Sequence, residues 1–132
     1  MKSLSPKAKK FLKGPHFAKL ATSMRDGSPQ VTPVWYMLDR GKLFVNTAKT
    51  RTKYKNISRD PRVCLLIDAG YPYVLVFGSA RVATERDAFK DIETLAIRYT
   101  GEEAGRKRSR DYYWKQDRVT LEIVPEKILE SL

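Results

Sequence analysis

Residues 17–48 read FAKLATSMRDGSPQVTPVWYMLDRGKLFVNTA, three strand-like segments separated by two tight turns. The segments are rich in β-branched and aromatic residues, which favour strands, and they span residues 17–24, 31–38 and 42–48. The turns contain Asp26-Gly27 and Asp39-Arg40-Gly41. Because turns this short join antiparallel neighbours, the stretch predicts a three-stranded meander within an antiparallel sheet.

The second of these segments contains two prolines, Pro29 and Pro33, within the polar stretch PQVTPVWY at 29–36. A proline cannot donate a hydrogen bond to its neighbour strand, so inside a strand it marks an edge or a bulge. We expect the sheet to open here and to offer exposed backbone groups to a flat ligand.

Further strands are predicted on the C-terminal side, at residues 62–69, 73–83 and 118–124. Gly78 falls in the middle of the second of them and predicts a bulge or a barrel corner. Six strands at regular spacing, with turn signals between them and few helices, are typical of an antiparallel barrel. The predicted fold class is mainly β (α+β), with a few short flanking helices.

Three helical segments are expected, at residues 5–13, 51–62 and 85–99. Ser5 is the predicted N-cap of the first segment, which is short and amphipathic. Thr84 is the predicted N-cap of the third and Gly101 is its stop. Between Gly101 and the last strand we expect a polar linker at 102–115, and after Pro125 a short tail.

The length of 132 residues suits one compact domain, so we assign residues 1–132 to a single domain. The longest apolar run, VCLLI at 63–67, is too short to cross a bilayer, and no membrane partner is expected. The N-terminus lacks the apolar core of a secretory signal, which predicts a cytoplasmic protein. Cys64 lies inside an apolar strand pattern, and we interpret it as a buried small hydrophobic residue rather than a reactive thiol.

The net charge of +11 predicts attraction to something anionic. Basic residues concentrate at 1–19, 40–62 and 106–110, and one interpretation of these clusters is a solvated surface. A more specific interpretation applies to Arg51, Lys53 and Lys55. Guanidinium and ammonium donors within a few residues suit an anionic phosphate held at a fixed point. This spacing favours a phosphate-bearing cofactor over a long polyanion.

Generic catalytic motifs are missing from the sequence. It contains no Walker loop, dinucleotide fingerprint, GxSxG elbow or cluster of metal ligands, so we assign no metal and no catalytic residue. His16 is the only histidine, and its position before the first strand favours a structural or surface role. The carboxylates of residues 85–99 are interpreted as the solvated face of that helix.

Several stretches together resemble the pyridoxamine phosphate oxidase-like split β-barrel proteins. They are HFAKLAT at 16–22, DGSPQVTPVWY at 26–36, NTAKTRTKYKNISRDPRV at 46–63 and YPYVLVFGSARV at 71–82. The sequence is most similar to the flavin/deazaflavin oxidoreductase branch, which includes enzymes dependent on coenzyme F420. This resemblance implies a six-stranded antiparallel split barrel of Greek-key type, with a flat cofactor bound at the interface of a homodimer.

The resemblance also implies which residues bind the cofactor. Arg51 and Lys53 would hold the phosphate, with Lys55 and Asn56 nearby. The ribityl side would be lined by Asn46 and Thr47, and the ring system by Gln30, Val31, Thr32, Pro33 and Val34. A wall from the partner subunit would come from Tyr71, Tyr73 or Trp35. For Trp35 and Tyr36, packing in the barrel core or the dimer interface is the alternative.

The implied activity is hydride transfer between reduced F420 and a small-molecule substrate stacked beside its ring. The cofactor carries the chemistry in such enzymes, so a missing catalytic acid or base is expected. FMN is the alternative cofactor, while the lysine-rich N-terminus and the 106–110 cluster favour F420, whose polyglutamate tail adds negative charge. A noncatalytic cofactor-binding protein and, as a minor alternative, a basic barrel that binds nucleic acid stay open.

Overall fold

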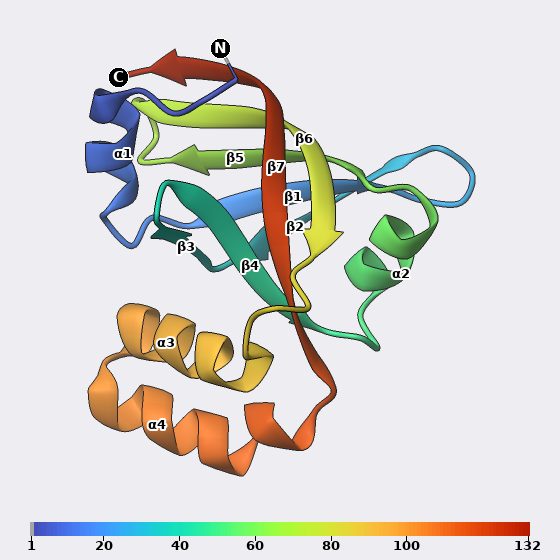
Figure 1. The fold of residues 1–132 in the computed structure, drawn as a ribbon, viewed down its shortest axis with the longest axis vertical. Coiled ribbons are helices and arrows are strands. Elements are labelled where there is room, and N and C mark those ends of the chain that lie inside the picture. The colour runs from blue at the N-terminus through green and yellow to red at the C-terminus, as the bar shows by residue number, and fades with distance from the viewer. Residues whose placement is uncertain (1) are drawn as a thin grey trace.

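Seven antiparallel strands form one curled sheet in the computed structural model, which describes residues 2–132 (Figure 1). The strands are β1 (Ala18–Ser23), β2 (Pro29–Val34), β3 (Tyr36–Asp39), β4 (Lys42–Ala48), β5 (Arg62–Asp68), β6 (Tyr73–Val82) and β7 (Arg118–Ser131). The helices are α1 (Pro6–Leu12), α2 (Thr52–Arg59), α3 (Ala88–Thr100) and α4 (Glu102–Asp111), followed by a 3₁₀ turn, η1 (Tyr113–Lys115). In space the strands follow the order β2-β1-β5-β6-β7-β4-β3.

The sheet has seven strands rather than the predicted six, because the segment predicted as one strand at 31–38 is divided at Trp35. Its first part, β2, pairs with β1, and its second part, β3, pairs with β4. These two strands stand at opposite ends of the spatial order, yet one residue separates them in the chain. The middle strand of the predicted meander is therefore a bent segment that pairs with two different partners. It connects both edges of the sheet, which gives the fold its barrel-like form. The edge position predicted from Pro29 and Pro33 is confirmed.

The last strand, β7, is twice as long as the strand predicted at 118–124. It continues through Pro125 to Ser131, pairing with β4 over Arg118–Ile123 and with β6 over Leu121–Ser131. The pairing register shifts between Phe77 and Gly78, with Pro125 opposite Gly78. A bulge can accommodate a proline inside a ladder, so the chain after Pro125 is strand rather than a tail. The bulge predicted at Gly78 is confirmed, and a side chain there would place its Cβ 2.0 Å from the Val124 carbonyl oxygen.

The core lies inside the curled sheet, where the inward-facing residues of every second strand position are fully buried. They include Leu20, Val45, Leu65, Ile67, Val74, Val76, Leu121 and Ile123. Helix α1 covers one end of this core with Ala8 and Leu12, and its predicted N-cap is confirmed, because the Ser5 hydroxyl accepts from the Ala8 N–H at 3.0 Å. Cys64 departs from the prediction, since it occupies an outward position of β5 and is half-buried.

Tyr36 belongs to this core, as the packing alternative for it proposed. Its side chain is fully buried, and its hydroxyl lies 2.6 Å from the Gly14 carbonyl oxygen and 3.1 Å from that of Leu12. Burial raises the pKa of Tyr36 to about 12. Arg98 of α3 donates to the same two carbonyl oxygens, at 2.7 and 3.2 Å. The C-terminal end of α1 is thus held by side chains from β3 and α3.

Two corrections concern the helices that follow β6. The N-cap of α3 is Asp87 rather than Thr84, because the Asp87 carboxylate accepts from the Phe89 and Lys90 N–H groups. Residues 102–115, predicted as a linker, form α4 and η1. Helix α4 escaped prediction because its buried residues are Gly105 and Ser109, which give no apolar period. No helix within residues 2–132 has the length and apolar content needed to span a membrane.

Helix α4 packs on α3 through the bare backbone of Gly105, which gives a test of this contact. A Cβ at Gly105 would lie 2.5 Å from the Ile97 nitrogen and 2.7 Å from its Cα. Alanine is the better helix former by about 1 kcal/mol, so a solvent-exposed α4 would be stabilised by Gly105→Ala. We expect the opposite, a loss of about 1–3 kcal/mol in the free energy of unfolding from overpacking, measured by urea denaturation.

The matched control is Lys107→Ala, an exposed position on the same helix, for which a change within about 0.5 kcal/mol is expected. If Gly105→Ala stabilises the protein instead, α4 does not pack against α3 as described.

Candidate functional site

A cleft of about 370 Å³ lies where the bend after β2, the strands β4 and β7, and the helices α2 and α3 approach one another. Its walls differ in character. Three lining residues are cations, Arg51, Lys53 and Arg118, and five are apolar or aromatic, namely Phe17, Trp35, Ile92, Leu95 and Tyr113. The two groups meet where the Arg118 guanidinium lies over the Tyr113 ring, 5.3 Å from its centroid. The remaining lining residues are Pro33, Val34, Asn46 and Thr47. Within residues 2–132, no carboxylate and no histidine lines this cleft.

The three cations come from two elements and line the same cleft. Arg51 is the N-cap residue of α2, Lys53 lies in its first turn, and Arg118 opens β7. Among the described residues none of the three forms an ion pair, in contrast to the paired Arg62, Arg81 and Arg86. Cations held together without counter-charges repel one another, so this part of the cleft is arranged for an anion.

The ionisation of these groups reflects their crowding. Burial lowers the pKa of Lys53, and the charges of Arg51 and Arg118 lower it further. Burial also lowers the pKa of Arg118 to about 10, with Arg51 acting in the same direction. A bound anion would favour the charged form of both groups and offset this effect.

The N-terminus of α2 adds to the positive potential. This helix begins beside the cleft with no side-chain N-cap bond and no acidic residue in its first turn. The free N–H groups and the dipole at a helix N-terminus favour negative charge. Arg51, Lys53 and the start of α2 therefore act on the same position.

Aromatic rings line another part of the cleft. Trp35 stacks on Tyr99 with ring centroids 5.2 Å apart and an angle of 6° between the planes, and Tyr113 meets Trp35 edge-on at 6.3 Å. The side chain of Phe17, which also lines the cleft, is 58% exposed. Surfaces of this kind bind planar apolar groups by stacking. The cleft suits a ligand that has an anionic end and a flat ring.

The cleft brings together half of the residues predicted to bind the cofactor, namely Pro33, Val34, Trp35, Asn46, Thr47, Arg51 and Lys53. Gln30, Val31 and Thr32 lie further back along β2 and do not line it. Lys55 is exposed on α2 and points elsewhere, while Asn56 is buried and donates to the Thr22 hydroxyl at 3.0 Å. This bond fixes α2 to β1.

Tyr71, in the turn between β5 and β6, and Tyr73, the first residue of β6, lie apart from the cleft, at the far end of β5 from α2 (Figure 1). They border a separate hollow with Leu66 and Leu75, and their rings meet edge-on at 5.7 Å. Neither tyrosine lines the cleft of its own chain.

Several lining residues were missed by sequence reasoning, above all Arg118 and Tyr113. Arg118 begins a strand that was predicted correctly, but no motif marks its side chain as part of a site. Tyr113 was assigned to the predicted linker. In the structure it lies in η1, which is attached to α3 because the neighbouring Trp114 donates to the Phe89 carbonyl oxygen at 2.9 Å. His16 has a structural setting, with its ring stacked on Phe11 at 4.3 Å.

Comparison with known proteins gives one family match and many structural ones. The family described as pyridoxamine 5'-phosphate oxidase matches residues 4–131. A conserved hypothetical protein from Mycobacterium tuberculosis is 25% identical, with a TM-score of 0.75 over 98% of this chain and 86% of the other. A structure described as an F420 reductase is 26% identical, with a TM-score of 0.72 over 96% of this chain and 98% of that one. The haem storage protein HutZ from Vibrio cholerae shares the fold at 16% identity, with a TM-score of 0.69 over 98% and 95%.

The repulsion within the cleft can be measured on the anion-free protein through Lys53→Met. A lysine whose pKa is lower in the folded than in the unfolded state destabilises the folded state when charged. Its removal should raise the free energy of unfolding at pH 7 by on the order of 0.5 kcal/mol. The advantage should shrink as the pH rises towards 10.5, the ordinary pKa of lysine, because the wild-type side chain then loses its proton.

Lys55→Met is the matched control, since Lys55 lies two residues along the same helix and outside the cleft. Chemical denaturation across this pH range compares the two variants with the wild type. A gain from Lys53→Met that is independent of pH would come from packing and would contradict the electrostatic explanation.

Proposed function

Because the chain belongs to the pyridoxamine 5'-phosphate oxidase family, whose members are flavin-binding and oxidoreductase-like, we propose that it is an F420-dependent oxidoreductase. The proposed reaction transfers a hydride from reduced F420 to a small organic acceptor. The observation that carries the proposal is that Arg51 and Lys53, which have no ion pair, meet at the start of α2 in a cleft that is also lined by aromatic rings. Charge-assisted hydrogen bonds from such a pair would hold the cofactor phosphate.

The residues of the cleft fit a phosphate-bearing tricyclic cofactor. The volume of the cleft, about 370 Å³, falls within the range of about 300–1,000 Å³ that is usual for small-molecule sites. With the phosphate at Arg51, the ring would extend along Pro33 and Val34 towards Trp35, and Asn46 would border the linking chain. The bound cofactor supplies the hydride chemistry. The protein's part is to bind, to orient and to exclude water, which needs no acid or base among the lining residues.

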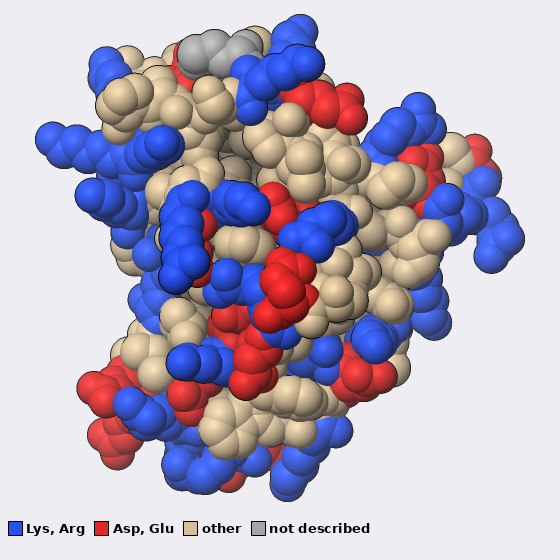
Figure 2. All heavy atoms as spheres, in the orientation of Figure 1, with Lys and Arg blue, Asp and Glu red and all other residues tan. Residues whose placement is uncertain are grey.

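Two observations favour F420 over FMN. The first is the 26% identity with a protein described as an F420 reductase. The second is the basic surface beside the cleft. Arg108 of α4 lies over the rings of Tyr112 and Tyr113 at 4.3 and 5.7 Å, and Tyr113 lines the cleft. Figure 2 shows Lys and Arg side chains gathered over α4 as well as over α1, with Asp and Glu side chains between. The α4 cluster would attract the anionic tail of F420.

The proposed assembly is a homodimer. The ring of Tyr71 is 85% exposed and lies far from the cleft of its own chain. In a dimer, Tyr71 and Tyr73 of one copy would close the cleft of the other, which is the role expected for them from the sequence.

Parallel fluorescence titrations of the apoprotein with F420 and FMN test the cofactor assignment. We expect a lower Kd for F420 and, with reduced F420 bound, re-oxidation when a suitable acceptor is added. Preference for FMN would move the protein to the flavin branch, and tight binding without turnover of any acceptor would make it a carrier. Salt-sensitive binding of a single-stranded oligonucleotide, with neither cofactor bound, would reject an oxidoreductase function.

The double variant Arg51→Ala/Lys53→Ala tests the phosphate site. Loss of two charge-assisted hydrogen bonds should weaken cofactor binding by at least about a hundredfold. Lys55→Ala/Arg59→Ala removes the same charge from the same helix outside the cleft and should bind almost as well as the wild type. Equal affinity of both double variants would mean that the phosphate binds elsewhere.

A further inference from the structure

We infer that Arg118 is a third anion-binding residue of the cleft, beside Arg51 and Lys53, and that Asn46 positions its guanidinium group. This assignment rests on the proposed function, because it takes the anion to be the phosphate of the cofactor. It is supported by a chain of hydrogen bonds that runs from a buried carboxylate to the cleft. In this chain the donor and the acceptor of each bond are fixed by the group before it.

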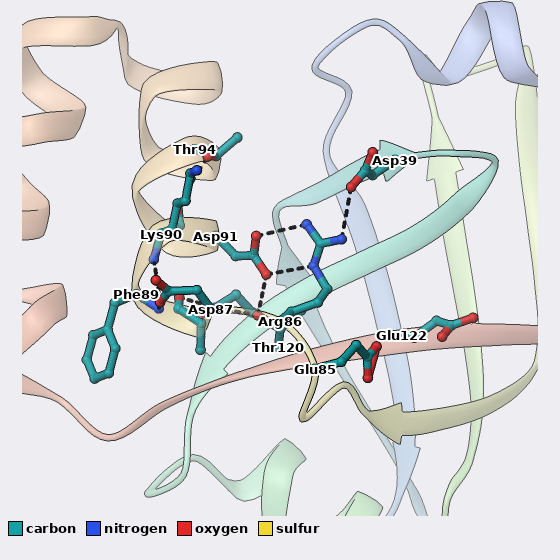
Figure 3. A network of polar contacts seen from close by, with 12 residues as sticks. Asp39, Glu85, Arg86, Asp87, Phe89, Lys90, Asp91, Thr94, Thr120 and Glu122 are labelled. Carbon is teal, nitrogen blue, oxygen red and sulfur yellow. Dashed lines mark hydrogen bonds and ion pairs between the residues drawn. The ribbon is translucent and has the colours of Figure 1, made fainter.

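The chain begins at Asp91 in the first turn of α3, a carboxylate with 6% of its surface exposed. Arg86 binds both of its oxygens, at 2.8 and 2.9 Å, and reaches Asp39 of β3 with its third nitrogen at 2.9 Å (Figure 3). A buried carboxylate held by a bidentate arginine is ionised and can only accept hydrogen bonds. Asp91 is therefore the fixed acceptor at the end of the chain.

Thr120 of β7 is the next group. Its hydroxyl donates its only hydrogen to Asp91 Oδ2 at 2.8 Å (Figure 3). The oxygen can then only accept from Asn46, whose Nδ2 lies 3.1 Å away. The same Nδ2 donates to the Ala88 carbonyl oxygen at 2.9 Å. Both partners require a donor, so the amide of Asn46 has one possible orientation.

This orientation turns Asn46 Oδ1 towards Arg118. Arg118 Nε donates to that oxygen at 2.9 Å, and Nη1 donates to Gln116 Oε1 at 2.7 Å. Nη2 has no hydrogen-bond partner among residues 2–132. The guanidinium plane is thus fixed by two neutral acceptors, while donors of the remaining nitrogen stay available to a ligand in the cleft that Arg118 lines.

The uncompensated charge of Arg118 sets it apart. Three arginines in the described part of the chain are half-buried, namely Arg86, Arg98 and Arg118. Arg86 is paired with two carboxylates, and Arg98 donates to three carbonyl oxygens at the end of α1. Arg118 has no carboxylate partner and lies over the Tyr113 ring at 5.3 Å, and the burial that lowers its pKa makes an anionic partner more valuable there. A guanidinium group in this setting suits bidentate binding of a phosphate.

The experiment compares phosphate-bearing ligands with their phosphate-free counterparts. Wild type, Arg118→Gln and Arg118→Lys are titrated with F420 and FMN, and in parallel with riboflavin and the deazaflavin core that lacks the phosphate. Arg118→Gln should weaken binding of the cofactor preferred by the wild type by about tenfold to a hundredfold. Binding of its phosphate-free counterpart should change less than about twofold. Arg118→Lys keeps the positive charge but lacks the planar pair of donor groups of a guanidinium, so its affinity should lie between those of the wild type and Arg118→Gln.

Arg25→Gln removes the same charge from an exposed site in the turn between β1 and β2, outside the cleft, and should leave both affinities unchanged. Asn46→Ala tests the positioning role, because it should weaken binding of the phosphate-bearing cofactor alone. In the double variant Arg118→Gln/Asn46→Ala, affinity should be no lower than in Arg118→Gln, since Asn46 acts through Arg118. Additive losses would overturn the positioning role, and thermal unfolding of each variant separates binding from loss of fold.

Two outcomes distinguish this inference from the proposed function. If Arg118→Gln and Arg118→Lys bind the cofactor as the wild type does while Arg51→Ala/Lys53→Ala does not, Arg118 has no part in the site and the proposed function stands. If the wild type binds neither cofactor, the proposed function fails, and calorimetric titration with inorganic pyrophosphate decides the role of Arg118. Binding that Arg118→Gln abolishes would support the inference, while equal binding, or none by the wild type, would overturn it.

Discussion

The structure depends on one bent segment, residues 29–39, which must serve both edges of the sheet. Its first half completes the ladder of β1 and its second half that of β4. The bend at Trp35 belongs to neither ladder, and Tyr36 turns its N–H towards the Tyr99 hydroxyl at 3.3 Å instead of towards a strand. At Trp35, where neither ladder continues, the bend and the Trp35 ring line the cleft. The cleft lies at this position because the sheet cannot close there by strand pairing.

The arrangement of charge around the cleft follows from how the other cations are used. Elsewhere in the described chain, half-buried arginines hold elements together. Arg86 links α3 to β3 through Asp91 and Asp39, and Arg98 secures the end of α1. The guanidinium donors that make these contacts are no longer available to a ligand. At the cleft, Arg51, Lys53 and Arg118 have no carboxylate partner, and their mutual repulsion lowers the stability of the folded protein until a bound anion offsets it. The stability of the protein and its affinity for an anion are therefore linked.

Much of the fold could be predicted from the sequence, because strands with β-branched residues and turns with Asp-Gly are local signals. The helix at α1, the strands β1, β4, β5 and β6, and the bulge at Gly78 all carry such signals. What failed depended on distant contacts. Trp35 breaks a strand only because its two sides meet different partners, β7 runs through Pro125 only because Gly78 faces it, and α4 is held by a glycine that resembles a linker residue. For the site, Arg51 and Lys53 share one helix and were found by their spacing, whereas Arg118 is 65 residues from Lys53 in the chain and no local pattern connects them.

The attachment of α4 through Gly105 and Ser109 has a consequence for how such proteins diversify. Only these two positions of the helix are buried, so the remaining positions of α4 are under little selection for folding. A descendant can exchange acidic, basic and aromatic residues along this helix without rebuilding the barrel. Since the helix leads directly into η1 and Tyr113 at the cleft, each exchange alters the approach of a ligand while the sheet beneath is unchanged. Substitutions along this helix can therefore change ligand specificity with little effect on the stability of the fold.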